Sequence, residues 1–140
     1  MSASPDSPAP EETRRRVLVV DDDRDAVAMM DYLLRLRGYE VRKAYDGVRA
    51  LEAAQEFRPQ VIVLDLVLPE MDGWEMAKRL RREPWGRGIR VIALSGYGEP
   101  RHKRRAQEAG CDYHITKPVV DFAAFLALFD AVPGSPPNYG

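Results

Sequence analysis

The chain has 140 residues, of which 45% are hydrophobic and 31% are charged, and its 21 Lys and Arg residues nearly balance 22 Asp and Glu residues. This length gives room for one domain with its own core. The composition excludes a chain that is disordered throughout, a collagen, a coiled-coil rod and a multidomain enzyme.

Proline-rich segments stand at both ends, and six of the eleven prolines lie in residues 1–14 and 133–140. Segments of low hydrophobicity that are rich in Pro, Ser and Glu cannot offset the entropy of ordering. We therefore expect disordered tails at 1–14 and 133–140 and one folded domain over 15–132. We expect no output domain after the folded part.

Short β-branched runs alternate with helical patterns along the folded part. The predicted strands are 16–21, 39–44, 60–65, 90–95 and 113–117, and the predicted helices are 25–36, 47–57, 73–82, 99–109 and 121–131. Apolar residues three and four apart form one apolar stripe on the first predicted helix: Ala26, Met29, Met30, Leu33 and Leu36. Gly38 and Gly110 follow helices where a left-handed residue is favoured.

The first, third and fourth predicted strands are apolar on both faces, which is typical of parallel strands covered by helices on each side. Five consecutive strand–helix units predict an α/β fold, namely a five-stranded parallel sheet in a doubly wound (βα)5 sandwich of the flavodoxin-like type. The longest aliphatic runs have four residues, whereas a membrane span needs roughly 20 apolar residues. We therefore expect no membrane insertion.

Polar residues end four of the five strands. The first strand leads into Asp21, Asp22 and Asp23, the third ends in Asp65, the fourth in Ser95 and the fifth in Lys117. In doubly wound sheets the functional groups gather at these carboxyl ends. Clustered carboxylates raise one another's pKa unless a cation lies between them, and a hard divalent ion, most simply Mg²⁺, resolves that conflict.

Each of these residues alone has an ordinary explanation. An Asp after a strand often caps the next helix, and Ser-Gly is a common turn. Their joint occurrence at matched strand ends favours a functional site.

Four segments of the chain resemble motifs of the response-regulator receiver domains of two-component signalling: VLVVDDD, VIVLDLVLPEMDG, IALSG and AGCDYHITKP. The resemblance covers about 118 residues, nearly everything but the tails. It implies a signalling phosphoacceptor that assists its own phosphorylation and dephosphorylation and is not an enzyme. Asp65 would accept the phosphoryl group from a sensor histidine kinase or a histidine phosphotransfer protein in a Mg²⁺-dependent reaction.

The resemblance also implies a role for each site residue. Asp22 and Asp65 bind Mg²⁺ directly, Asp21 binds it through water, and the backbone carbonyl of Val67 completes the protein ligands. Ser95 donates a hydrogen bond to one phosphoryl oxygen, and Lys117 pairs with another. The Lys117–Pro118 peptide bond is cis.

Two positions depart from the family pattern. His114 stands where the family usually has a switch aromatic. We expect either that it enters a space opened by inward movement of Ser95, or that it is a half-exposed residue of an edge strand. Val67 and Tyr97 flank the expected path of hydrolytic water without a carboxylate, amide or amine to orient it, and we therefore predict slow autodephosphorylation.

Ten basic and two acidic residues lie between Lys78 and Arg105. The basic helix at 99–109 is either a solvated face or a docking surface for an acidic partner. The resemblance implies signalling to a downstream protein through the fourth helix, the fifth strand and the last helix. A homodimer that forms through the same face is an alternative. The domain as a whole is not basic, so we expect no direct nucleic-acid binding.

The chain lacks the features of a secreted protein. Its first ten residues lack the basic start and apolar centre of a secretory signal. Its single cysteine, Cys111, cannot form a disulfide within the chain and is predicted to be a small apolar filler. These features favour the reducing cytoplasm.

Two alternatives belong to other functional classes. Asp21 and Asp23 form an Asp-x-Asp motif after the first strand, which suggests a small phosphoaspartate-type phosphatase resembling the haloacid-dehalogenase family. A receiver-like adaptor that is not phosphorylated is the other. A dinucleotide-binding domain is excluded, because aspartates stand where its glycine-rich loop would lie. The chain could be a free-standing regulator, a phosphorelay intermediate or part of a larger kinase.

Overall fold

A parallel sheet of five strands organises the fold. The computed structural model describes residues 15–96 and 100–130, and the tails predicted at 1–14 and 133–140 lie outside them. The strands are β1 (Arg16–Val20), β2 (Glu40–Ala44), β3 (Val61–Asp65), β4 (Arg90–Ser95) and β5 (Tyr113–Thr116). The helices are α1 (Arg24–Leu36), α2 (Gly47–Phe57), α3 (Gly73–Arg82), α4 (Pro100–Ala109) and α5 (Phe122–Ala127), with a 3₁₀ turn, η2 (Pro84–Gly86).

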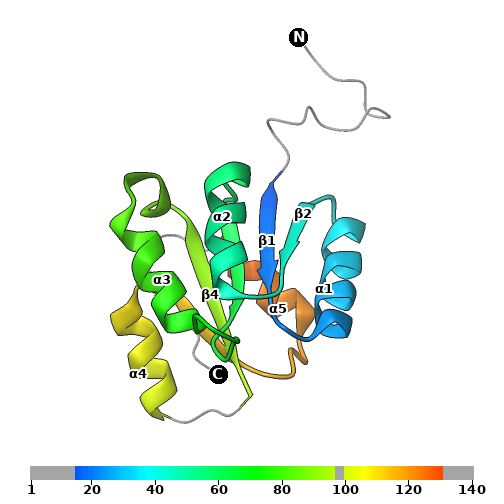
Figure 1. Cartoon of the computed structure of the whole chain (residues 1–140). Coiled ribbons are helices and arrows are strands. Elements are labelled where there is room, and N and C mark those ends of the chain that lie inside the picture. Colours follow the sequence, from blue (N-terminus) through cyan, green and yellow to red (C-terminus); the bar gives the residue numbers. More distant parts are fainter. Residues whose placement is uncertain (1–14, 97–99, 131–140) are drawn as a thin grey trace.

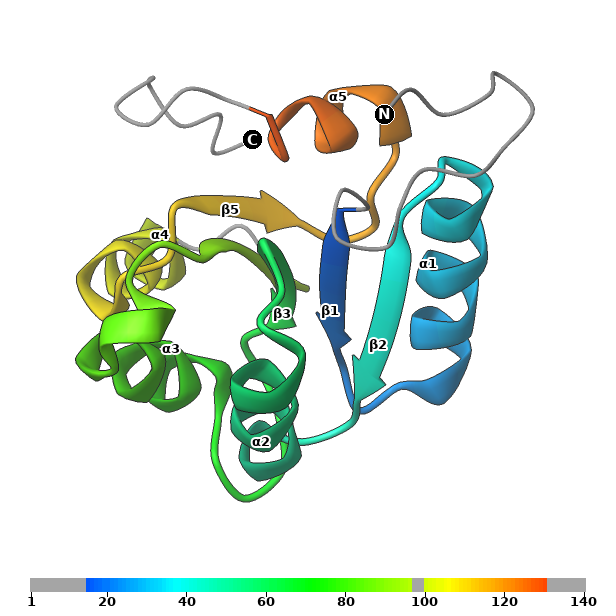
Figure 2. The same ribbon diagram turned by 90° about the horizontal axis from the view of Figure 1, so that it is seen from above.

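The strands lie in the order β2-β1-β3-β4-β5 and all pairs are parallel (Figure 1). Helices α1 and α5 cover one face of the sheet, and α2, α3 and α4 cover the other (Figure 2). The order reverses between β1 and β3, where the carboxyl ends of neighbouring strands leave a crevice. The predicted doubly wound α/β fold is therefore confirmed.

Two apolar cores lie on opposite faces of the sheet. The core under α2–α4 includes Leu18, Ile62 and Leu80, and the core under α1 and α5 includes Val63 and Phe125. All residues of β3 are buried, as are nearly all of β1 and β4. The prediction that these three strands are apolar because both faces are covered is thus confirmed.

Local signals set the ends of most helices. An aspartate side chain accepts a backbone N–H at the start of each of four helices; these N-caps are Asp23, Asp46, Asp72 and Asp121. Gly38 and Gly110 have φ angles of 89° and 100° after α1 and α4, as predicted for left-handed helix stops.

The apolar stripe of α1 is present, but it does not face the core. The buried residues of this helix are Val27 and Leu34, whereas Met29 and Leu36 are 60% and 64% exposed. The reason is that the helix is rotated so that the Val27 face meets the sheet. Most of the predicted stripe instead lines a groove of about 360 Å³ beside α5, with Ala26, Met29, Met30, Leu33 and Phe122 among its lining residues.

The last helix is shorter than predicted. Helix α5 ends at Ala127, and a turn through Leu128 and Phe129 follows. Phe125 and Phe129 are buried in the core under α1 and α5. Within the described parts of the chain, none of the helices has the length and apolarity that a membrane span requires.

Candidate functional site

The carboxyl edge of the sheet brings three of the predicted residues into contact. The Lys117 ammonium lies 3.0 Å from Asp21 Oδ2 and 3.2 Å from Asp65 Oδ2. Both aspartates are buried, at 5% exposure each. The ammonium therefore bridges two buried carboxylates that come from different strands.

A third carboxylate joins this pair from the solvent side. One carboxylate oxygen from each of Asp21, Asp22 and Asp65 lies within 4.8 Å of the other two, and Asp22 is exposed. Oxygen-only ligand sets of this kind suit hard divalent cations. The residues present therefore fit a divalent ion at the exposed side of the cluster.

The two buried carboxylates differ in their readiness to ionise. Burial, together with the charge of Asp21, raises the pKa of Asp65 to about 6, although the Val67 N–H and Lys117 oppose this. Burial also acts to raise the pKa of Asp21, but hydrogen bonds from the Asp23 N–H and Lys117 outweigh it and lower that pKa. Asp21 therefore holds its charge more firmly than Asp65 does.

Burial acts to lower the pKa of Lys117 as well, but the hydrogen bond to Asp21 and the charges of Asp65 and Asp21 raise it above its usual value. The lysine is consequently a fixed cation at neutral pH. Its backbone also takes part in the site, because its N–H donates to the Ser95 carbonyl at 2.8 Å. This bond ties the end of β5 to the end of β4.

The backbone around Asp65 is fixed from the side of α3. The Val67 N–H donates to Asp65 Oδ1 at 3.1 Å, and the Gly73 N–H donates to the Leu66 carbonyl at 3.0 Å. A Cβ added at Gly73 would lie 2.6 Å from the Asp65 carbonyl oxygen and 2.7 Å from the Leu66 Cα. Only glycine therefore allows α3 to begin so close to the phosphoacceptor candidate.

Ser95 and His114 form a buried pair next to this cluster. Ser95 ends β4 directly after Leu94, which pairs with Asp65 in the sheet. Its Oγ lies 2.7 Å from His114 Nε2, and neither residue is accessible to solvent. The alternative of a half-exposed His114 is therefore wrong, because the side chain is fully buried. Its movement on phosphorylation stays a prediction.

Other predicted residues fall into three groups. Asp23 caps α1 by accepting from the Asp25 and Ala26 N–H groups, so it serves the helix rather than the cluster. Val67 contacts Asp65 through its N–H, and its carbonyl as a metal ligand stays a prediction. Tyr97 lies outside the described residues.

The Lys117–Pro118 peptide bond is cis, as the resemblance implies. The sequence places Gly73 in the loop beyond Asp65, and the structure shows in addition its close approach to the Asp65 backbone. Its signal was present, since a glycine directly after a capping aspartate marks a helix start that can approach other backbone closely.

Comparisons with known proteins agree with this geometry. The chain matches the response regulator receiver domain family over residues 17–129. It is 42% identical over 108 residues to the transcriptional regulatory protein PrrA of Mycobacterium tuberculosis, covering 77% of this chain and 46% of PrrA. It is 32% identical over 105 residues to the polar-differentiation response regulator DivK of Brucella anthropi, covering 75% of this chain and 85% of DivK.

Among solved structures, the chemotaxis response regulator CheY4 of Vibrio cholerae superposes with a TM-score of 0.79 at 30% identity, covering 86% of this chain and 100% of CheY4. The chain spans less than half the length of several curated relatives that it matches, PrrA among them.

Proposed function

Because this chain belongs to the response regulator receiver domain family, we propose that Asp65 accepts a phosphoryl group from a phosphohistidine in a Mg²⁺-dependent reaction. The observation that carries the proposal is the Lys117 ammonium held between buried Asp21 and Asp65 at 3.0 and 3.2 Å. In this role the protein is a phosphoacceptor that assists its own modification, rather than an enzyme that turns over a substrate.

The reaction needs an ionised Asp65 carboxylate as the nucleophile. With a pKa of about 6, this group is mostly ionised at neutral pH. One carboxylate oxygen forms a bond to phosphorus while the phosphorus–nitrogen bond of the donor breaks, and the departing imidazole takes up a proton from solvent. The product is an acyl phosphate on Asp65.

Charge on the transferred phosphoryl oxygens must be balanced during this step. Lys117 pairs with one oxygen, and the Ser95 hydroxyl donates a hydrogen bond to another. Asp22 and Asp65 would hold Mg²⁺ directly, Asp21 through water, and the Val67 carbonyl would complete the set. When bound, this ion supplies positive charge next to the phosphoryl oxygens.

The phosphodonor is proposed to be a sensor histidine kinase or a histidine phosphotransfer protein. The groove between α1 and α5 supports such docking, because Asp21 and Lys117 of the site line it together with Met29 of α1. Met29, Tyr32 and Leu36 are exposed on α1. An apolar helix of the donor packed there would bring its phosphohistidine toward Asp65.

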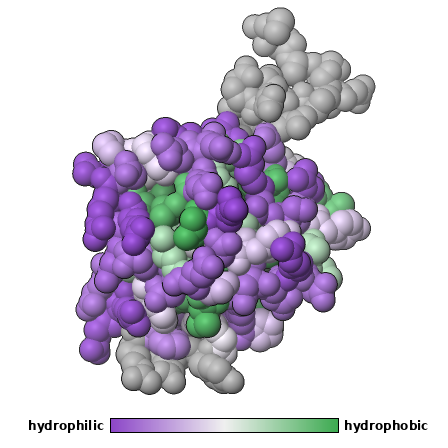
Figure 3. Space-filling view, viewed as in Figure 1, coloured by the Kyte–Doolittle hydropathy of each residue, from purple (hydrophilic) through white to green (hydrophobic). Residues whose placement is uncertain are grey.

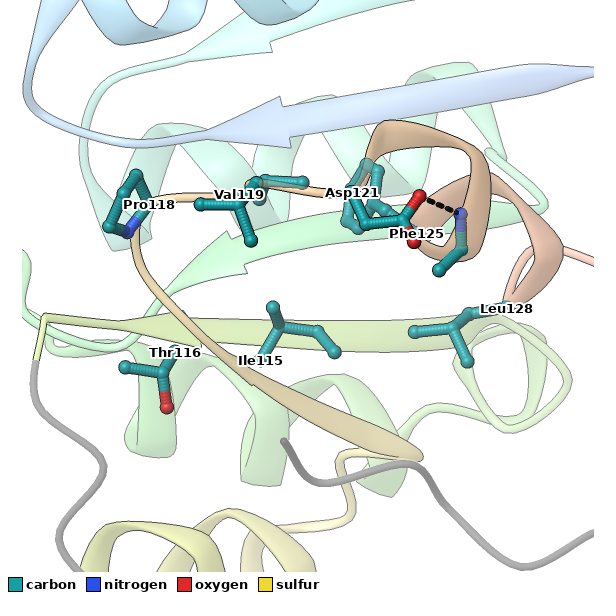
Figure 4. Close-up of a pocket in the computed structure, with 9 residues that line it drawn as sticks. Ile115, Thr116, Pro118, Val119, Asp121, Phe125 and Leu128 are labelled. Carbon is teal, nitrogen blue, oxygen red and sulfur yellow. Dashed lines mark hydrogen bonds between the residues drawn. The ribbon is translucent and has the colours of Figure 1, made fainter.

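The face formed by α4, β5 and α5 is proposed to bind a downstream protein or a second copy of the chain. A pocket of about 190 Å³ lies between β5 and α5, and Figure 4 shows Ile115, Val119 and Leu128 pointing into it. Val120 at its rim is 89% exposed. Uncovered apolar side chains on this face support an interface there.

In the view of Figure 3 the outer edge of α3 and α4 is mostly hydrophilic, and a hydrophobic patch lies on the side of α3 toward α2. Lys78, Arg82, Arg104 and Arg105 are exposed on these helices. This supports an acidic protein as the downstream partner rather than nucleic acid, because the chain as a whole carries a net charge of −1. We also retain the cytoplasm as the proposed compartment.

The decisive experiment is incubation of the protein with a small phosphodonor and Mg²⁺, followed by intact mass measurement. A gain of one phosphoryl group in the native protein, and none in Asp65→Asn, is the expected result. No labelling at all would favour the adaptor. Hydrolysis of an added phosphomonoester that depends on Asp21 rather than Asp65 would favour the phosphatase.

The lifetime of the phosphorylated form tests the proposed slow autodephosphorylation. Val67 is 62% exposed beside Asp65 and carries no group that could orient a water molecule. We expect a slow loss of the phosphoryl group in a time course and a faster loss in Val67→Asn. Rapid loss that Val67→Asn leaves unchanged would contradict this proposal.

A further inference from the structure

The hydrogen bond between Ser95 and His114 joins the phosphoryl site to β5. Ser95 Oγ and His114 Nε2 are 2.7 Å apart, and both side chains are inaccessible to solvent. A serine hydroxyl carries one proton, whereas a neutral imidazole has one nitrogen that donates and one that accepts. The proton in this bond can therefore belong to either partner.

Phosphorylation decides which of Ser95 and His114 donates the proton in this hydrogen bond. Under the proposed function, on which this inference rests, the Ser95 hydroxyl donates its only proton to a phosphoryl oxygen. Oγ then has only lone pairs to offer to His114. The bond at 2.7 Å can persist only if Nε2 carries a proton and donates it to Oγ.

We propose that His114 is a positioning residue for Ser95, and that in the phosphorylated protein His114 Nε2–H donates to Ser95 Oγ while the Ser95 hydroxyl donates to the phosphoryl group. The two hydrogen bonds then form a directed chain from β5 to the phosphoryl oxygen. Phosphorylation fixes the protonation state of Nε2, and His114 in turn orients the hydroxyl.

The surroundings of His114 are compatible with this arrangement. Its strand neighbour across the sheet is Ala93, and among the described residues the charged or titratable groups that act on it include Lys103 and His102 of α4. Burial and these two groups lower the pKa of His114. The ring is therefore neutral at pH 7, and a proton on Nε2 requires a specific tautomer rather than a second positive charge.

Nitrogen NMR of the imidazole rings tests the proposal directly. The spectrum is recorded at neutral pH with Mg²⁺, before and after addition of beryllium fluoride, which mimics a phosphoryl group. The chain has two histidines, and a His102→Asn variant assigns their signals. We expect Nε2 of His114 to have the chemical shift of a protonated nitrogen in the complex.

Two substitutions provide the functional readout. In His114→Gln the side-chain amide can still donate from a similar position, whereas His114→Phe retains an aromatic ring but no donor. We expect His114→Phe to bind beryllium fluoride about five-fold more weakly, the usual result of losing one hydrogen bond. We expect His114→Gln to stay within about two-fold of the native protein.

The outcomes separate this inference from the proposed function. An unprotonated Nε2 in a protein that binds the mimic would overturn the inference alone, as would equal affinities for His114→Phe and His114→Gln. Failure of the native protein to bind the mimic or to accept a phosphoryl group would overturn both. If His114→Phe does not fold, the nitrogen spectrum of the native protein decides.

Discussion

Replacing Asp65 with asparagine should stabilise the folded protein at neutral pH, although it removes the proposed phosphoacceptor. Burial and the charge of Asp21 raise the pKa of Asp65 from 3.8 to about 6. Each pKa unit corresponds to about 1.4 kcal/mol, so ionisation of Asp65 destabilises the folded state by about 3 kcal/mol. Asparagine has the same shape and no charge, and this destabilisation disappears.

The stability gained by Asp65→Asn over the native protein should increase as the pH rises. Because the pKa of Asp65 is higher in the folded than in the unfolded state, the folded protein keeps this proton to a higher pH. The corresponding stability is present below about pH 4 and is lost as the pH rises to about 6. Native protein and Asp65→Asn should therefore be almost equally stable at about pH 4 and differ most above about pH 7.

Urea unfolding with a chelator present, followed by tryptophan fluorescence at both pH values, measures this difference. Glu56→Gln is the matched control, since its side chain is 76% exposed and should change the free energy of unfolding by less than about 0.5 kcal/mol. Addition of Mg²⁺ should stabilise the native protein and narrow the gap. An Asp65→Asn protein that is no more stable than the native protein at neutral pH would refute the reasoning.

Three further substitutions or measurements probe the surroundings of the site. Lys117→Met leaves two buried carboxylates without their cation, so urea unfolding at neutral pH should show a free energy of unfolding about 3 kcal/mol lower than that of the native protein. In the same variant an NMR titration should give a pKa of Asp65 above the native value of about 6. Gly73→Ala should lower the free energy of unfolding by about 1–3 kcal/mol, since the new Cβ meets backbone atoms at 2.6 and 2.7 Å. Burial raises the pKa of the Cys111 thiol to about 12, so a disulfide reagent at about pH 8 should modify it at least about 100-fold faster in urea than in the folded protein.

Each of these has its own control. Gly88→Ala is the partner of Gly73→Ala, because a Cβ there would meet nothing within 4 Å. Equal unfolding free energies for these two alanine variants would contradict the close approach of α3. A Lys117→Met protein as stable as the native one would show that the ammonium does not offset the carboxylate repulsion. Rapid labelling of folded Cys111 would mean that the thiol is accessible.

The site residues at the ends of the strands could be predicted from the sequence, because a polar residue follows each apolar run. Asp21, Asp65 and Ser95 all stand at such boundaries, and the parallel sheet then carries them to one edge. The helix starts were predictable for a similar reason, since Asp72 supplies its own capping signal before α3.

Contacts between distant segments were not predictable in the same way. Helix α1 carries two candidate apolar faces, and only packing against the sheet selects Val27 and Leu34 over the predicted stripe. The burial of His114 depends on a hydrogen bond to a residue 19 positions away.

Arg81 is a similar case. It lies in the last turn of α3, where a basic side chain also interacts favourably with the helix dipole. In the structure its guanidinium donates to the carbonyls of Gly86, Ile89 and Gly110 and to Asp112, which holds the chain after α3 against the turn after α4.

The close packing at Gly73 means that the backbone near Asp65 is more tightly packed on the α3 side than on the β4 side. On the α3 side, backbone already touches backbone and there is no spare volume, whereas a Cβ at Gly96 on the β4 side would meet nothing within 4 Å. We expect an added group on Asp65 to displace atoms more easily toward β4 and, through the Lys117 N–H bond to Ser95, toward β5. The absence of a Cβ at residue 73 would thus help to set the direction in which the backbone around Asp65 moves.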